Sequence, residues 1–212
     1  MSKKVEVKSS NHSRSIADYI KSVDPKFAKD AKTLLKLFKD NSGKMWLGTN
    51  GGGINTFNSL QLKISHGLFN YEDAGQAVYA FAETSDGTVW FTTDNGQLNK
   101  IALNGKISQA VIKNNKPISH LLVDDKDNFW LKTEQSKPSE PGSLYYYQTN
   151  TGNLIEHDAW RATSTHNDFS NLILAEGKLW FIDEAKQFSS FDLDSNKLEQ
   201  INDENQTIYT VC

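Results

Sequence analysis

The stretch Asp40–Phe57, DNSGKMWLGTNGGGINTF, contains a tight turn, a short strand with one tryptophan, a glycine-rich turn and a second strand. Asp40-Asn41-Ser42-Gly43 has typical turn chemistry, because Asp and Asn tolerate a left-handed backbone and Gly adopts it readily. Looser copies of the stretch follow along the rest of the chain. Each copy contains a turn and then a strand with one tryptophan, and the four anchor tryptophans are Trp46, Trp90, Trp130 and Trp180.

The anchor tryptophans lie about 40 to 50 residues apart, with several short strands in each interval. This period is typical of the blades of a β-propeller. We therefore predict an all-β fold of about four blades, each of four antiparallel strands, plus the start of a fifth. The last repeat stops after its first strand, Thr207–Val211, which favours an incomplete arc of a larger propeller. A small closed ring, completed by that strand or by the N-terminal segment, is the alternative.

The repeat predicts the division of the chain. Residues 1–32 form an N-terminal segment, in which Ile16–Val23 would be the outer strand of a preceding blade. The four blades are residues 33–70, 71–113, 114–160 and 161–203, and residues 204–212 form the first strand of a truncated or closing blade. The third blade carries a longer, Pro-rich middle loop, Gln135–Gly142, which we interpret as a tolerated insertion.

Composition excludes several classes of protein. The 212 residues include 23 basic and 26 acidic side chains, for a net charge of −3, so no basic surface for nucleic acid is expected. The single cysteine, Cys212, excludes a disulfide framework within the chain. No apolar run reaches the roughly 20 residues of a membrane-spanning helix, and Met1–Ser15 is too polar for a signal peptide. We expect either a cytoplasmic chain or a piece of a longer exported protein.

The repeated tryptophans are predicted to pack between blades, because a large aromatic side chain recurring at one strand position is usually part of a core. Trp160 is the one tryptophan outside the repeat, and it is followed by Arg161. We take these two residues as candidates for an exposed, ligand-contacting surface.

The repeat resembles the two-component regulator propeller repeat, in which Asp-x-x-Gly-x-apolar-Trp is followed by an apolar residue, Thr, glycines and a strand. The first unit carries Asp40, Gly43, Trp46, Leu47, Gly48, Thr49, Gly52, Gly53, Ile54 and Phe57. The second carries Asp86, Gly87, Trp90, Phe91, Thr93 and Gly96. The third and fourth units keep Trp130 with Thr133, and Trp180.

This resemblance implies a non-enzymatic sensor module of a bacterial signal-transduction protein. Propellers of this family form the periplasmic sensing region of membrane-bound hybrid histidine kinases or diguanylate cyclases. The resemblance implies a small-molecule ligand, with carbohydrate as one candidate, no cofactor and no metal. It also implies self-association or pairing with further blades, and membrane attachment only through a parent protein. A plain protein–protein interaction scaffold is another interpretation of the same repeats.

The second unit, Asp86–Ile107 (DGTVWFTTDNGQLNKIALNGKI), also resembles blades of streptogramin lyases, which are metal-dependent propeller enzymes, and the third unit has a His and a Glu at the relative positions those enzymes use. That resemblance implies His120 as general base and Glu134 as a residue that helps to hold a divalent cation. Only one inner strand carries such a histidine, so we keep the lyase as the alternative. The other histidines, His12, His66, His157 and His166, have no spacing typical of a metal site.

Overall fold

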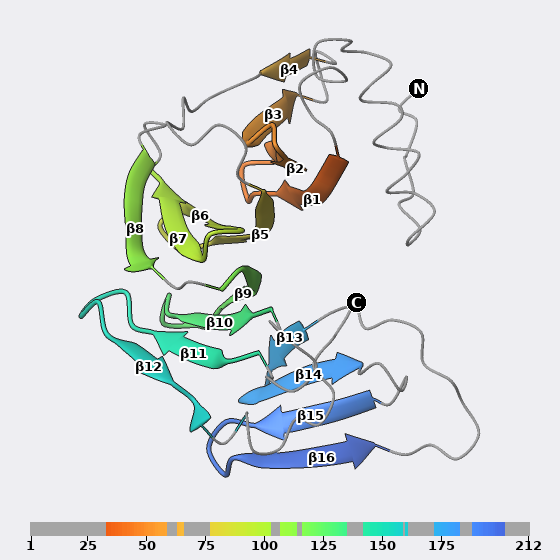
Figure 1. The fold of residues 1–212 in the computed structure, drawn as a ribbon, viewed down its shortest axis with the longest axis vertical. Coiled ribbons are helices and arrows are strands. Elements are labelled where there is room, and N and C mark those ends of the chain that lie inside the picture. The colour runs from red at the N-terminus through yellow and green to blue at the C-terminus, as the bar shows by residue number, and fades with distance from the viewer. Residues whose placement is uncertain are drawn as a thin grey trace. The chain divides into compact units, whose positions relative to one another are not determined.

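The computed structural model describes residues 33–58, 63–65, 77–102, 107–113, 116–134, 142–158, 160, 172–182 and 188–201. Within these residues, the strands β1 to β16 form four antiparallel sheets of four strands each (Figure 1). The predicted all-β blades are therefore confirmed. The chain divides into two compact units, Met1–Val78 and Tyr79–Cys212. Among the described residues, no helix has the length and apolar character needed to cross a membrane.

The first unit contains one sheet, with its strands in chain order. They are β1 (Thr33–Lys39), β2 (Met45–Asn50), β3 (Ile54–Asn58) and β4 (Lys63–Ser65). The predicted turn at Asp40-Asn41-Ser42-Gly43 joins β1 to β2, and Gly43 has the left-handed φ of 86° that the turn requires. Its amide donates to the carbonyl of Asp40 over 2.9 Å.

The second unit contains three sheets built in the same way (Figure 1). The first has β5 (Val78–Glu83), β6 (Val89–Thr93), β7 (Gln97–Ile101) and β8 (Ile107–Lys113). The second has β9 (Ile118–Val123), β10 (Phe129–Thr133), β11 (Leu144–Tyr147) and β12 (Leu154–Glu156). The third has β13 (Leu172–Ala175), β14 (Lys178–Ile182), β15 (Phe188–Asp192) and β16 (Lys197–Ile201).

Neighbouring sheets of the second unit pack face to face through the anchor tryptophans. Trp90 on β6 lies against Phe129 of the next sheet, with ring centroids 4.9 Å apart. Trp130 on β10 belongs to a second buried cluster, together with Leu179 and Phe191 of the last sheet. The predicted packing role is thus confirmed for Trp90 and Trp130. Burial of a large apolar side chain stabilises a fold by roughly 1.5–3 kcal/mol, so these two residues contribute strongly to holding successive blades together.

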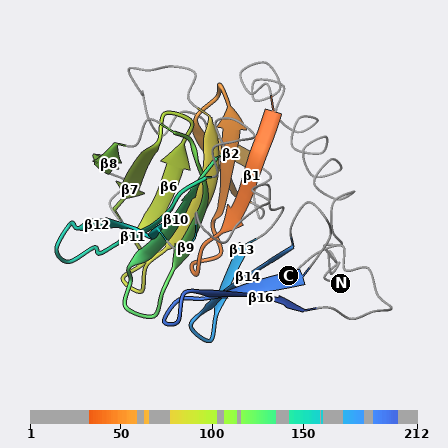
Figure 2. The ribbon, with the colours of Figure 1, turned by 60° about the horizontal axis from the view of Figure 1, so that its bottom comes forward.

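β9, the first strand of its sheet, contacts β6 of the sheet before it and β13, the first strand of the sheet after it (Figure 2). The Thr92 hydroxyl on β6 donates over 2.8 Å to the carbonyl of Ile118 on β9, and β9 in turn contacts β13. The backbone hairpins between β9 and β10 and between β13 and β14 are thereby brought to the same rim.

Several predicted segments lie outside the described residues. These are the strand at Ile16–Val23, the closing strand Thr207–Val211 and residues 135–141 of the Pro-rich loop. The prediction of an arc rather than a closed ring stays a prediction.

Candidate ligand-binding cleft

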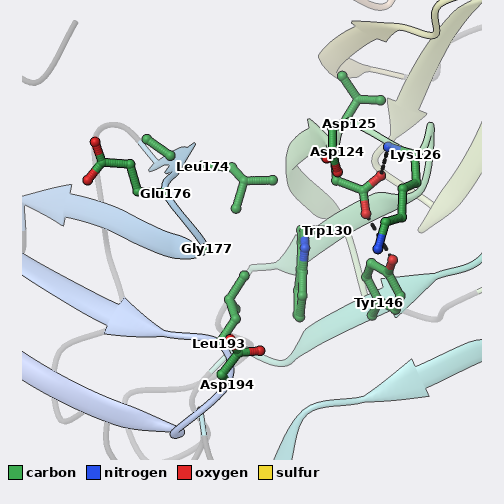
Figure 3. Close-up of a pocket in the computed structure, with 12 residues that line it drawn as sticks. Asp124, Asp125, Lys126, Trp130, Tyr146, Leu174, Glu176, Gly177, Leu193 and Asp194 are labelled. Atoms are coloured by element: carbon green, nitrogen blue, oxygen red, sulfur yellow. Dashed lines mark hydrogen bonds between the residues drawn. The ribbon is translucent and has the colours of Figure 1, made fainter.

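A cleft of about 630 Å³ lies between the β9–β12 sheet and the β13–β16 sheet (Figure 3). Binding sites for small molecules usually have volumes of about 300–1,000 Å³ and combine apolar walls with a few polar groups. On one side the cleft is lined by Trp130, Tyr146 and the turn that follows β9. On the other side it is lined by Leu174, Leu193 and the two hairpin turns of the last sheet.

The turn after β9 is organised by the carboxylate of Asp124. One oxygen, Oδ1, accepts the backbone N–H groups of Lys126 and Asn128 over 2.9 and 2.8 Å. This is the local side-chain-to-backbone bonding that makes aspartate common in turns. It fixes the positions of Asp125 and Lys126 at the mouth of the cleft.

The other carboxylate oxygen of Asp124 holds the aromatic wall of the cleft. The Tyr146 hydroxyl donates to Asp124 Oδ2 over 2.8 Å, and the Asn128 side-chain amide donates to the Tyr146 oxygen over 2.9 Å (Figure 3). Burial, together with the hydrogen bond and negative charge of Asp124, raises the pKa of the Tyr146 phenol above its ordinary value. The Tyr146 ring therefore stays neutral and fixed, 4.7 Å from that of Trp130.

This arrangement departs from the other repeats at two equivalent positions. In the β1–β4 sheet, the carboxylate of Asp40 accepts the indole N–H of Trp46 over 2.8 Å. In the β5–β8 sheet, the Thr84 hydroxyl accepts the indole N–H of Trp90 over 3.3 Å. Asp124 precedes Trp130 by the same number of residues, but its carboxylate accepts a hydrogen bond from the Tyr146 hydroxyl instead of from the indole. The residues that pair with the four anchor tryptophans across the next strand are Thr56, Lys100, Tyr146 and Ser190. The β9–β12 sheet alone has an aromatic residue there.

The opposite wall is shaped by a tight hairpin between β13 and β14. Its two central residues, Glu176 and Gly177, have φ values of 54° and 72°, which is the backbone of a type I′ turn. Ala175, Glu176 and Gly177 are all exposed, so this turn forms an open lip. Leu174 and Leu193 are partly buried and supply the apolar surface below it.

The polar rim of the cleft is predominantly acidic. Asp125, Glu176 and Asp194 are exposed carboxylates, and Lys126 is the one basic residue that lines the cleft. Among the described residues, none of the three carboxylates forms an ion pair. Asp124 also lines the cleft, but its two oxygens are already occupied by hydrogen bonds from the turn and from Tyr146.

The predicted exposed surface at Trp160 is wrong. Its side chain is completely buried and meets the rings of Phe181 and Phe191 edge-on, with centroids 5.5 and 5.3 Å away. The physical reason is the large apolar surface of the indole, which is buried in a cluster with Trp130, Leu144 and Leu179 rather than left in water. Trp160 thus extends the core across two sheets, and Arg161 lies outside the described residues.

The alternative lyase residues both belong to the β9–β12 sheet, with His120 on β9 and Glu134 directly after β10. His120 on β9 pairs in register with Lys132, and the backbone amide of Glu134 donates to the carbonyl of Pro117 over 2.8 Å. The imidazole Nδ1 of His120 is 3.0 Å from the Ser119 hydroxyl. Among the described residues, no group of three or more His, Cys, Asp or Glu side chains lies close enough to hold a metal ion. A catalytic role for His120 and Glu134 stays a prediction.

Sequence reasoning did not identify the cleft. Of the residues that line it, sequence patterns single out only the anchor tryptophan Trp130. The available signal was the three successive tyrosines of β11, Tyr145–Tyr147, since the strands at this place in the other sheets carry few aromatic residues. The contact between Tyr146 and Asp124 joins residues 22 positions apart, and the opposite wall comes from another sheet. No local pattern could reveal it.

The fold defines a chain of β-propeller blades, and comparisons with known proteins agree with it. Residues 73–95 match the family model described as the two component regulator propeller, which confirms the resemblance for the second repeat. No curated protein sequence matches this chain at a significant level.

Solved structures share the fold at low sequence identity. One is the extracellular domain of a one component system from B. thetaiotaomicron, with a TM-score of 0.61, 16% identity and coverage of 84% of this chain and 25% of that chain. Another is PorZ, a surface component of the type-IX secretion system of Porphyromonas gingivalis, with a TM-score of 0.56, 13% identity and coverage of 83% and 28%. A chain of the mitotic checkpoint complex has a TM-score of 0.59, 10% identity and coverage of 83% and 53%. This chain therefore spans a quarter to about half of those chains.

Proposed function

We propose that this chain is a non-enzymatic, ligand-sensing propeller module of a bacterial signal-transduction protein, and that its ligand binds in the cleft lined by Trp130 and Tyr146. The observation that carries the proposal is the cleft itself, with an aromatic wall held by hydrogen bonds, an apolar wall from the next sheet and a polar rim. Its volume of about 630 Å³ is suitable for a small molecule.

The position of the cleft supports a sensing mechanism. A ligand there would touch the β9–β12 sheet and the β13–β16 sheet at once, and so would favour one relative position of the two blades over others. Ligand binding shifts a conformational equilibrium only by the difference in affinity between the two states. In the parent protein, such a shift would alter how propellers associate across a membrane-bound dimer.

The proposed location is the periplasm or cell surface, as part of a longer membrane-bound sensor. It is supported by the match of residues 73–95 to the regulator propeller model and by the extracellular domain that shares the fold. A cytoplasmic location is the alternative.

The proposal is tested by blocking the cleft. Ala175 is exposed at its lip, so Ala175→Trp would fill the entrance with little effect on the core. The matched control is Leu154→Trp on the exposed outer strand β12, away from the cleft. A library of saccharides, amino acids and amines is screened by thermal unfolding, because a ligand at about 100 times its Kd stabilises by about 2.7 kcal/mol.

The expected result is at least one compound that raises the Tm of the wild type and of Leu154→Trp, but not that of Ala175→Trp. A compound that stabilises all three proteins equally would place its site elsewhere and would contradict the proposal. If no compound stabilises the wild type, and the chain instead captures a partner protein equally well with Ala175→Trp, the interaction scaffold is the better interpretation.

A further inference from the structure

The carboxylates at the rim of the cleft differ in how they are used. Asp124 accepts hydrogen bonds at both oxygens and serves to position Tyr146. Asp125, Glu176 and Asp194 are exposed, line the same cleft and form no ion pair among the described residues. The groups available to a ligand therefore carry three negative charges, and Lys126 supplies one positive charge.

The lysine and the available carboxylates are distributed unevenly over the two walls, with Asp125 on the wall that carries Lys126 (Figure 3). In Figure 3 the Lys126 side chain lies beside Asp124 and Tyr146, whereas Glu176 and Asp194 lie on the opposite wall. Asp194 is on the turn facing Tyr146, with its carboxylate directed toward Trp130 (Figure 3). A cleft lined mainly by one sign of charge attracts ligands of the other sign, and the effect extends over about 8 Å at physiological ionic strength.

Below this rim the cleft is apolar. Val123, Leu174 and Leu193 line it. Trp130 lies between Leu193 and Tyr146 (Figure 3). An apolar body of a few methylene groups would be removed from water against these side chains while its charged end stayed at the rim. The combination fits an amphipathic ligand rather than a bare metal ion.

The aromatic residues do not offer the surface that stacks well on a sugar. Trp130 is only 8% exposed, and its ring lies between those of Tyr146 and His157, at centroid distances of 4.7 and 5.6 Å. Tyr146 is half-buried and held by its hydroxyl. Stacking requires an open ring face, so neither residue provides a sugar platform.

From the rim charge, the apolar walls and the covered indole, we infer that the cleft binds a small organic cation with an aliphatic body, such as a diamine or an alkyl guanidine. This inference rests on the proposed ligand-binding role of the cleft and adds the chemical class of the ligand. The ammonium or guanidinium group would lie among Asp125, Glu176 and Asp194, with the methylene groups against Leu174 and Leu193.

The test is calorimetric titration of the whole chain with cadaverine and agmatine as cationic probes. Pentanediol is the neutral match to cadaverine, and maltose represents the sugars. We expect at least one cationic probe to bind with a Kd of about 1 mM or tighter, and pentanediol and maltose to give no binding up to about 10 mM. Binding of the cation should weaken as salt is added, since the carboxylates are exposed.

Two sets of variants locate the site. Asp125→Asn, Glu176→Gln and Asp194→Asn combined remove the rim charge while keeping side-chain shape, and should weaken cation binding by about tenfold or more. Glu83→Gln, Glu156→Gln and Glu199→Gln combined remove three carboxylates that do not line the cleft, and should leave binding unchanged. Ala175→Trp should abolish binding.

Each outcome decides the inference. It is overturned if neither cation binds, if pentanediol binds as tightly as cadaverine, or if the two triple variants lose binding equally. If maltose binds instead and Ala175→Trp abolishes that binding, the ligand-binding role of the cleft stands and the cationic class is wrong. If a cation binds but Ala175→Trp binds it equally well, the site lies elsewhere, which contradicts both the inference and the proposed function.

Discussion

The carboxylate of Asp127 accepts both the backbone N–H and the hydroxyl of Ser85, at 2.7 and 2.5 Å, and so joins the turn of one blade to the turn of the blade before it. Asp127 stands where the first two repeats have Gly43 and Gly87, and it has their left-handed backbone, with φ of 59°. That conformation costs a non-glycine residue roughly 1 kcal/mol. The contact to Ser85 offsets this strain.

Two substitutions of Asp127 separate strain from contact. Asp127→Ala keeps the strained backbone and loses both hydrogen bonds, so we expect a destabilisation of about 1–2 kcal/mol. Asp127→Gly loses the same bonds but relieves the strain, so it should be clearly more stable than Asp127→Ala. Urea denaturation monitored by tryptophan fluorescence measures both. If Asp127→Gly were more stable than the wild type, the contact to Ser85 would contribute less than the strain costs.

The carboxylate of Asp40 should make stability depend on pH. Burial raises its pKa, but hydrogen bonds from Ser42, Trp46 and the backbone of Lys44 outweigh burial and lower the pKa below its ordinary value. A carboxyl whose pKa is lower in the folded state stabilises the fold above its unfolded pKa of about 3.9 and loses that contribution as pH falls through the folded value.

Asp40→Asn should therefore be less stable than the wild type at neutral pH, with the difference shrinking below about pH 4. Thermal unfolding of both proteins from pH 7 down to pH 3 measures this difference directly. Ser42→Ala serves as a control that removes one hydrogen bond and leaves the titrating group in place. A difference that stayed constant with pH would show that the substitution acts through packing around Trp46 rather than through charge.

Truncation of Trp160 and of Trp180 to alanine should lower the free energy of unfolding by very different amounts, because the two side chains differ in burial. Trp160 is fully buried against Phe181 and Phe191, so Trp160→Ala should cost about 3–5 kcal/mol. Trp180 is half-buried, stacks on Phe188 at 5.4 Å and donates its indole N–H to the Ala175 carbonyl, so Trp180→Ala should cost much less. Chemical denaturation of the two variants provides the comparison. Equal losses would contradict the core position assigned to Trp160.

These tryptophans also show what the sequence could and could not reveal. The anchor tryptophans were predictable because turn chemistry and strand spacing recur with them, and those are local properties of the chain. The burial of Trp160 was not, because this tryptophan lies outside the repeat and its ring contacts come from Phe181 and Phe191 of another sheet. The cleft was hidden for a similar reason, since Asp124 and Tyr146 meet only through the register of β9, β10 and β11.

The Asp124–Tyr146 pair provides the most direct check on the wall of the cleft. Burial and then the hydrogen bond and charge of Asp124 raise the pKa of Tyr146, whereas burial alone raises that of the adjacent Tyr147. Asp124→Asn should therefore lower the pKa of Tyr146 toward its ordinary value of about 10 and leave Tyr147 unchanged. Tyrosine-labelled NMR titration resolves the two phenols.

Since Asp124→Asn also weakens the turn, Tyr146→Phe is the companion variant, expected to lose about 1 kcal/mol of stability while keeping the aromatic ring beside Trp130. If the pKa of Tyr146 did not move in Asp124→Asn, the carboxylate would not be what holds this ring, and the wall of the cleft would rest on packing against Trp130 alone.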